Sequence, residues 1–291
     1  MRLDDSRESD NVEDRRGDGS GGGGLPMGGR GVGIGAILIA IAASYFLGVD
    51  PQMVLGLIGG GGGQQVSAPA AHHPPANDAE TRFVRKVLAE TEDTWQQIFR
   101  ASGKQYREPK LVLFSGRTDT ACGQGQAATG PFYCPADQKV YIDLSFYRDL
   151  RNRFRAPGEF AQAYVIAHEI GHHVQNLLGT SQQVHQARQQ AHSAAQANAL
   201  SVRLELQADC YAGVWAKRTD AAKGILEPGE LEQAITAASA IGDDRLQKQT
   251  RGVAVPETFT HGSSEQRVRW FRRGFEQADP RQCDTFRTAQ L

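Results

Sequence analysis

The sequence predicts an α+β domain behind a single amino-terminal transmembrane helix, and three observations lead to this fold class. Two short β-rich runs lie in the middle of the 291-residue chain. From residue 157 onward the pattern is helical almost throughout. An uncharged apolar stretch precedes both regions. A small sheet followed by helices is an α+β arrangement, and a 40% share of hydrophobic residues is enough for a core.

The amino-terminal part of the chain changes composition several times. Residues 1–30 mix both charge signs with a glycine run and hold almost no large apolar side chains, so a disordered tail is expected. Residues 31–49 carry no charge, and at about 1.5 Å per residue they would span roughly 28 Å, close to a hydrocarbon core. They predict a transmembrane helix. A cleaved signal peptide is the alternative, although the polar lead and the apolar run are both long for one.

The basic residues around the apolar run predict its orientation. Arg15, Arg16 and Arg30 precede it, and no Lys or Arg follows until Arg82. The tail is therefore expected in the cytoplasm and the rest of the chain outside it. Residues 50–79 form a Gly/Pro-rich linker, and residues 80–291 form the exported domain.

Overall charge excludes one class of partner. The formal net charge is −1 and the pI is about 6.7. The chain therefore lacks the overall basic field that drives binding to nucleic acid, and no nucleic-acid partner is expected.

Four cysteines lie in the exported domain, and none is in CxxC spacing. An even count in an oxidising compartment predicts two disulfides instead of a structural zinc site. Three pairings are possible. A bridge between Cys122 and Cys134 would close the glycine-rich loop between them, which leaves Cys210 to pair with Cys283.

The elements of the exported domain follow from hydrophobic spacing. Residues 80–101 place apolar side chains at helical spacing. The runs 109–116 and 139–146 flank the cysteine loop and predict two strands of a small sheet. Helices are expected over 159–178 and 199–219. Two arginine clusters are expected on solvated helix faces, with contact to lipid headgroups or anionic partners as the alternative. They are Arg148, Arg151, Arg153 and Arg155, and Arg267, Arg269, Arg272 and Arg273.

Residues 165–176 read VIAHEIGHHVQN, and helical spacing separates their packing side chains from a polar cluster. His168 and His172 lie one turn apart with Glu169 beside them. This is an H-E-x-x-H match, in which two imidazoles can share a zinc ion and the glutamate can reach a water bound to it. The alternative is a surface helix with two unrelated histidines. Gly171 is costly inside a helix and therefore indicates close packing.

A catalytic zinc site needs a third protein ligand, and the metzincin continuation of the motif is absent from this sequence. The helix expected over 199–219 places Glu205 and Asp209 one turn apart on a largely apolar face. Two carboxylates are costly to bury there without a cation. Glu205 is the expected third ligand, and Asp209 is expected to accept the second N–H of a ligand histidine. In the alternative they pair with exposed arginines such as Arg203 or Arg269.

The motifs resemble those of a known family. H-E-x-x-H at 168–172 followed by E-x-x-x-D at 205–209 is similar to a gluzincin. With RESDNVEDRRG in the tail, the single anchor, and HGSSEQR near the carboxyl end, the chain resembles the bacterial putative neutral zinc metallopeptidase family over nearly its whole length. This resemblance implies a zincin-like domain on the bacterial cytoplasmic membrane, facing the periplasm or the exterior and acting on peptide substrates.

The resemblance also implies a mechanism. His168, His172 and Glu205 would hold Zn²⁺, and Glu169 would act as general base toward the zinc-activated water that attacks the peptide carbonyl. A catalytically silent, zinc-stabilised binding or scaffold domain is the alternative. Glu169 favours the enzyme, because a silent domain does not need a carboxylate beside the first histidine.

Two further roles follow from the resemblance. His261 is the candidate donor to the developing oxyanion, because it opens a loop before the last helix, and Tyr211 and Tyr164 compete for that role. An edge strand precedes the active-site helix in zincins and pairs with extended substrate, and residues 139–144 are expected to be that strand.

Overall fold

Residues 1–17 and 78–291 are described by the structure, a computed structural model, and both stretches belong to one unit. The predicted transmembrane helix at 31–49 and nearly all of the predicted linker lie outside the described residues. In the part of the chain that is described, no helix is both long and apolar enough to cross a membrane.

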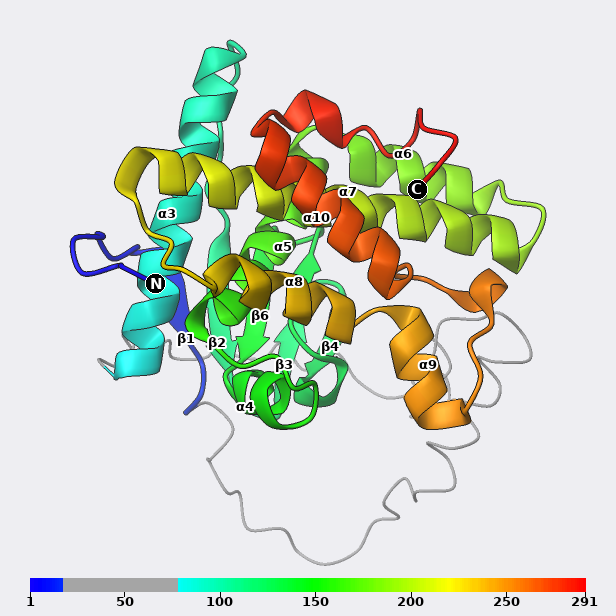
Figure 1. Cartoon of the computed structure of the whole chain (residues 1–291), viewed down its shortest axis with the longest axis horizontal. Coiled ribbons are helices and arrows are strands. Elements are labelled where there is room, and N and C mark those ends of the chain that lie inside the picture. The colour runs from blue at the N-terminus through cyan, green and yellow to red at the C-terminus, as the bar shows by residue number, and fades with distance from the viewer. Residues whose placement is uncertain (18–77) are drawn as a thin grey trace, which may run out of the picture. The chain divides into compact units, whose positions relative to one another are not determined.

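The main sheet has four strands in the order β1-β2-β6-β5 (Figure 1). Strands β1 (Val12–Asp14), β2 (Lys110–Phe114) and β6 (Lys139–Asp143) run parallel to one another. Strand β5 (Phe132–Cys134) is antiparallel to β6 and forms one edge of the sheet, with β1 at the other edge. The two strands predicted from β-rich runs are confirmed as β2 and β6, and their apolar side chains are buried.

The expectation that residues 139–144 form the edge strand is wrong. Strand β6 lies between β2 and β5, so its backbone groups are paired on both sides. The short strand β5 takes the edge because the chain reverses between residues 134 and 139 and lays β5 against β6. A run of three residues gives too weak a pattern to be recognised from sequence.

A separate hairpin of β3 (Arg117–Thr120) and β4 (Gly123–Gln126) carries an exposed Cys122 in its turn. Cys122 is bonded to the buried Cys134 at the end of β5, so the hairpin is covalently tied to the edge strand. Cys210 is bonded to Cys283, and both predicted pairings are therefore present.

Residues 1–17 are not the disordered tail that composition predicts. Leu3 and Val12 are buried, and the strand that contains Val12 pairs with β2. The hydroxyl of Ser9 donates to Glu92 over 2.6 Å in a buried contact. This segment has too few apolar residues for a core of its own, but it needs only an existing sheet to join. The composition of a segment does not show whether the rest of the chain offers a sheet that it can join.

The predicted α+β fold class is confirmed, with eight α-helices among the described residues and a sheet that packs against them. The helices expected over 80–101, 159–178 and 199–219 are present as α3, α5 and α7, and α7 begins five residues earlier than predicted. The helices are α3 (Ala79–Ala101), α4 (Ser145–Asn152), α5 (Glu159–Leu177), α6 (Thr180–Gln189), α7 (Ala194–Lys223), α8 (Glu230–Ala240), α9 (Asp243–Arg251) and α10 (Ser264–Gln277).

Helix α10 crosses α7 at a point where both helices carry glycine. A methyl group at Gly213 would overlap the carbonyl oxygen of Phe271, and one at Gly274 would overlap that of Cys210. The backbones therefore approach more closely than any larger residue allows. Ser263 caps α10 in a reciprocal capping box with Gln266, which fixes where the helix begins.

Candidate metal centre

The site is built where α5 and α7 come close together. A Cβ atom placed on Gly171 would lie 3.0 Å from the Cα of Ala208 and 3.0 Å from its carbonyl oxygen, so only glycine permits this distance between the helices. The sequence-based expectation of close packing at Gly171 is confirmed. The approach brings the histidines of α5 within reach of the carboxylates of α7.

Three predicted ligands converge at this crossing. His168 Nε2 lies 3.2 Å from one carboxylate oxygen of Glu205, and His172 Nε2 lies 3.4 Å from the other. One ligand atom from each of the three residues falls within 4.8 Å of the others. The centroids of the two imidazole rings are 4.8 Å apart, and the rings are nearly perpendicular.

The second nitrogen of each histidine is also held. His168 Nδ1 donates to Asp209 Oδ1 over 2.8 Å, as the sequence predicted for Asp209. His172 Nδ1 donates to Gln175 Oε1 over 2.9 Å, and the amide of Gln175 donates to the carbonyl of Leu204. Both contacts fix the tautomer in which Nε2 is the free ligand atom. Two imidazoles and one carboxylate with oriented rings fit the donor set of a catalytic zinc ion.

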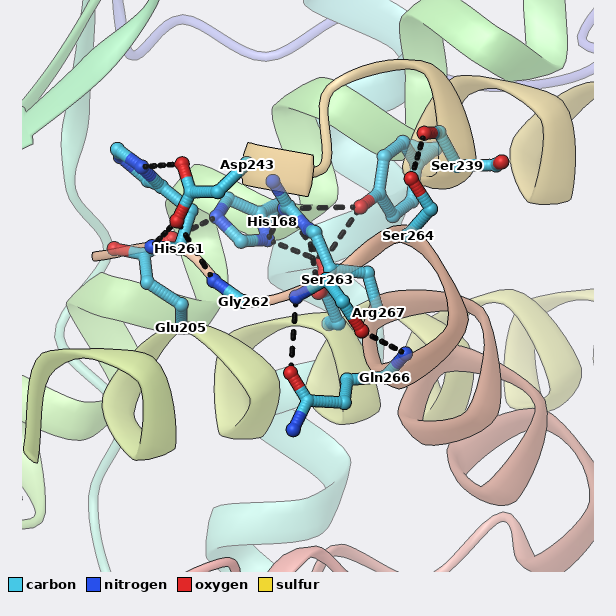
Figure 2. A network of polar contacts seen from close by, with 12 residues as sticks. His168, Glu205, Ser239, Asp243, His261, Gly262, Ser263, Ser264, Gln266 and Arg267 are labelled. Atoms are coloured by element: carbon cyan, nitrogen blue, oxygen red, sulfur yellow. Dashed lines mark hydrogen bonds and ion pairs between the residues drawn. The ribbon is translucent and has the colours of Figure 1, made fainter. Parts of the chain in front are cut away.

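Arg267 completes a buried network behind His168 (Figure 2). Its Nε donates to Asp209 Oδ2 and its Nη2 to Asp209 Oδ1, each over 2.9 Å. Tyr164 donates its hydroxyl to Asp209 Oδ1 over 2.5 Å, and Arg267 donates to that hydroxyl oxygen. Asp209 is fully buried and Arg267 is 2% exposed.

The expectation of a solvated face is therefore wrong for Arg267. Arg267 shares its helix face with Trp270, Phe271 and Gly274, at spacings of three, four and seven residues. That spacing was the available signal in the sequence. The alternative expectation for Glu205 and Asp209 was a pairing with arginines on an exposed face. Asp209 does pair with an arginine, but this pair is buried inside the protein.

Charge and burial act against each other at these groups. Burial alone would raise the pKa of Asp209, but Arg267 and His168 lower it to about 2. Burial would lower the pKa of His168, but Asp209 and Glu205 raise it to about 10. The pKa of Glu205 falls well below its ordinary value because the facing histidines outweigh burial. The histidines and the carboxylates of the site therefore stabilise each other's charged forms.

Glu169 lies beside the ligand group without a structural partner. Its side chain is buried, and it makes no hydrogen bond within the described part of the chain. Burial raises its pKa above the ordinary value, although His168 and His172 act in the opposite direction. A carboxylate in this setting binds a proton more readily than a solvated one.

His261 lies on the loop before α10, where Asp243 of α9 holds it (Figure 2). Asp243 Oδ2 accepts the backbone N–H groups of Thr260, His261 and Gly262, and Oδ1 lies 3.2 Å from His261 Nδ1. The imidazole is half-exposed and close enough for the charge of Glu205 to raise its pKa, with Asp243 as the stronger influence against burial. Sequence reasoning missed Asp243.

The two tyrosines that competed with His261 are both buried. The hydroxyl of Tyr164 is buried between Asp209 and Arg267. The ring of Tyr211 is buried and packs edge-on against Trp95, with 5.4 Å between ring centroids. The oxyanion role of His261 stays a prediction.

His173, the third histidine of the motif, is a core residue. Its Nε2 donates to the carbonyl of Arg107, and its Nδ1 accepts from the hydroxyl of Tyr133 over 3.0 Å. Asn176 also donates to that hydroxyl. Burial lowers the pKa of His173 to about 4. These contacts bind the edge strand β5 to α5.

Family comparison adds to this geometry. Residues 1–286 match the family described as "Putative neutral zinc metallopeptidase". The chain belongs to this family. The resemblance predicted from the motifs is confirmed, and membership of the neutral zinc metallopeptidase family supports zinc as the ion for the His168, His172 and Glu205 group.

Other members of the neutral zinc metallopeptidase family are similar over most of their length. The chain is 51% identical over 293 residues to the uncharacterized protein YpfJ of Escherichia coli (strain K12), covering 98% of this chain and 99% of YpfJ. It is 41% identical over 263 residues to the uncharacterized protein Rv2575 of Mycobacterium tuberculosis (strain H37Rv), covering 84% and 85%. No solved structure matches the chain.

Proposed function

We propose that the chain is a membrane-anchored zinc metalloendopeptidase in which Glu169 is the general base. The observation that carries this proposal is the environment of the Glu169 side chain. The Glu169 side chain is 7% exposed, follows the ligand His168 directly in α5, and makes no hydrogen bond to another described residue. No hydrogen bond gives this carboxyl group a structural role, and burial raises its pKa, so a catalytic use accounts for its position.

The residues divide the work of peptide hydrolysis. His168, His172 and Glu205 would hold zinc, which when bound polarises a carbonyl and lowers the pKa of water from about 15.7 to about 7. Glu169 accepts the proton of the attacking water and passes it to the leaving amine. His261, oriented by Asp243, donates to the oxygen on which negative charge develops.

Edge strand β5 is the proposed partner for the backbone of the substrate. Only one side of β5 is paired in the sheet, and Tyr133 on this strand is hydrogen-bonded to His173 and Asn176 of α5. An extended peptide that adds to the free side of β5 would lie next to the helix that carries the ligands.

Location at the cell envelope is supported by the cysteines and the apolar run. Both disulfides need an oxidising compartment, such as the periplasm or the exterior of a bacterium. The uncharged residues 31–49 are the proposed means of membrane attachment.

A single substitution tests the proposal. Glu169→Gln keeps the shape of the side chain but removes the base, so zinc content stays at one ion per chain while cleavage falls about 10²- to 10⁴-fold. Glu232→Gln on the exposed face of α8 is the matched control and retains full activity. The assay is cleavage of a peptide library with and without a chelator, alongside metal analysis.

Two results would contradict the proposal. Full cleavage by Glu169→Gln would remove Glu169 from the mechanism. A wild-type protein that binds zinc but cleaves no peptide in the library would favour the catalytically silent scaffold.

A further inference from the structure

The two described stretches of the chain meet at the edge of the main sheet that is formed by the carboxyl ends of its parallel strands β1, β2 and β6. Arg16 follows β1 by two residues, and its Nη2 lies 3.0 Å from Asp78 Oδ2, immediately before α3. Arg16 also donates to the hydroxyl of Thr81 in the first turn of that helix. The end of the first described stretch and the start of the second therefore lie next to each other.

These contacts require the amino terminus to lie in the same compartment as the rest of the domain. Buried contacts bind residues 1–17 to the domain, among them the strand pairing of β1 with β2 and the bond from Ser9 to Glu92. Ion pairs reinforce them, including Lys139 with Glu13 at 2.9 Å. A chain that crossed a bilayer once between Gly17 and Asp78 would separate these partners into two compartments.

A basic helix lies at the same edge. Strands β1, β2 and β6 are parallel, so their carboxyl ends share one edge of the sheet, and neighbouring strands are about 4.8 Å apart. Helix α4 begins two residues after β6 ends and is therefore placed about 10 Å from the end of β1. Figure 1 shows α4 at the end of the domain where β1 stops and α3 starts.

The arginines on and after α4 have no acidic partners in the described chain. All four are exposed, and the single acidic residue among them is Asp149. Arginine matches phosphate groups through paired N–H donors, and each basic residue near an anionic bilayer strengthens membrane partitioning about fivefold. The four are Arg148, Arg151, Arg153 and Arg155.

We propose that this edge of the domain docks on the anionic headgroups of the membrane through the arginines of α4, with residues 1–17 and 78–291 on the same side of the bilayer. This arrangement replaces the expectation that the amino terminus lies in the cytoplasm while the rest of the chain lies outside it. Chain connectivity supports the bilayer as the occupant, because the uncharged residues 31–49 are joined to the domain at this edge. The proposal does not depend on peptidase activity.

The docking is tested by hydrogen exchange of the full zinc-loaded chain in nanodiscs. With about a third phosphatidylglycerol in phosphatidylcholine, amides of 145–155 exchange at least tenfold more slowly than in phosphatidylcholine alone, whereas amides of α10 do not change. Changing all four α4 arginines to glutamine abolishes the difference. Equal removal of charge elsewhere, with Lys104→Gln, Arg188→Gln, Lys248→Gln and Arg272→Gln, preserves it. Exchange that is insensitive to lipid charge, or protection that survives in the α4 variant, overturns the docking.

Sidedness is tested with single cysteines in spheroplasts and a membrane-impermeant maleimide. Asp10→Cys and Lys104→Cys are both exposed positions, one in each described stretch. Both label before permeabilisation, to the same extent. Labelling of one before and the other only after permeabilisation overturns the shared side. Labelling of both only after permeabilisation upholds the shared side and contradicts the proposed envelope location instead.

Discussion

Replacing Arg267 with methionine would leave a buried carboxylate without its cation. Arg267 makes two hydrogen bonds to Asp209, and both side chains are almost fully inaccessible to solvent. Methionine fills a similar volume without charge, so the substitution isolates the electrostatic contribution. Asp209 would keep the bonds from Tyr164 and His168.

The size of the effect follows from the contacts. The pKa of Asp209 is about 2, against an ordinary value of 3.8, which corresponds to about 2 kcal/mol of stabilisation of the charged form at neutral pH. Breaking a buried pair by removing one partner costs about 3 to 5 kcal/mol. We expect Arg267→Met to lower the free energy of unfolding by that larger amount. Zinc affinity should fall about 10- to 100-fold, because Asp209, the partner of His168, loses the arginine that holds it in place.

Urea unfolding and zinc titration measure both quantities, and a double-mutant cycle with Asp209→Asn separates the pair from its surroundings. The double variant should lose less stability than the sum of the two single variants, because no charge is left unpaired. Arg267→Lys keeps the charge and should recover part of the loss. Additive single effects, or a loss under about 1 kcal/mol for Arg267→Met, would refute the reasoning.

Three other outcomes are expected. Asp243→Asn should lower kcat about tenfold with KM and zinc content unchanged, because it disturbs His261 and not the ligands; an unchanged kcat would remove His261 from the reaction. The pKa of His173 is about 4 in the folded protein and about 6.5 in the unfolded chain, so the unfolded chain binds more protons between these pH values. The free energy of unfolding therefore falls by about 3 kcal/mol as the pH drops from 6.5 to 4. Urea unfolding at pH 4.5 and 7.5 should show that the His173→Gln variant loses this pH dependence. An equal change in the free energy of unfolding between the two pH values in wild type and variant would contradict the prediction. Gly171→Ala should cost about 1 to 3 kcal/mol and weaken zinc binding, since the added methyl forces α5 from α7; full stability with full zinc affinity would show that the helices can separate freely.

Helical periodicity explains why the ligand group could be predicted. Residues four apart on a helix share a face whatever surrounds them, so His168 with His172, and Glu205 with Asp209, were recognisable pairs. The need for a third ligand then linked the two helices. The structure brings these residues together as expected.

The supporting residues could not be predicted in the same way. The spacing of Arg267 to Trp270, Phe271 and Gly274 indicates the buried face of α10, but the sequence does not show that this face crosses α7 closely at Gly213 and Gly274 and brings Arg267 to Asp209. Asp243 reaches His261 from another helix, and no local pattern joins them.

The sequence by itself determined the residues of the candidate metal site and the presence of two disulfides, because these depend on residue type and short spacing. Tertiary structure alone decided that residues 1–17 supply a strand, that β5 and not β6 is the edge, and that Arg267 neutralises Asp209. Each of those outcomes depends on a partner far away in the chain, and long-range pairing leaves no periodic trace in the segment that takes part in it.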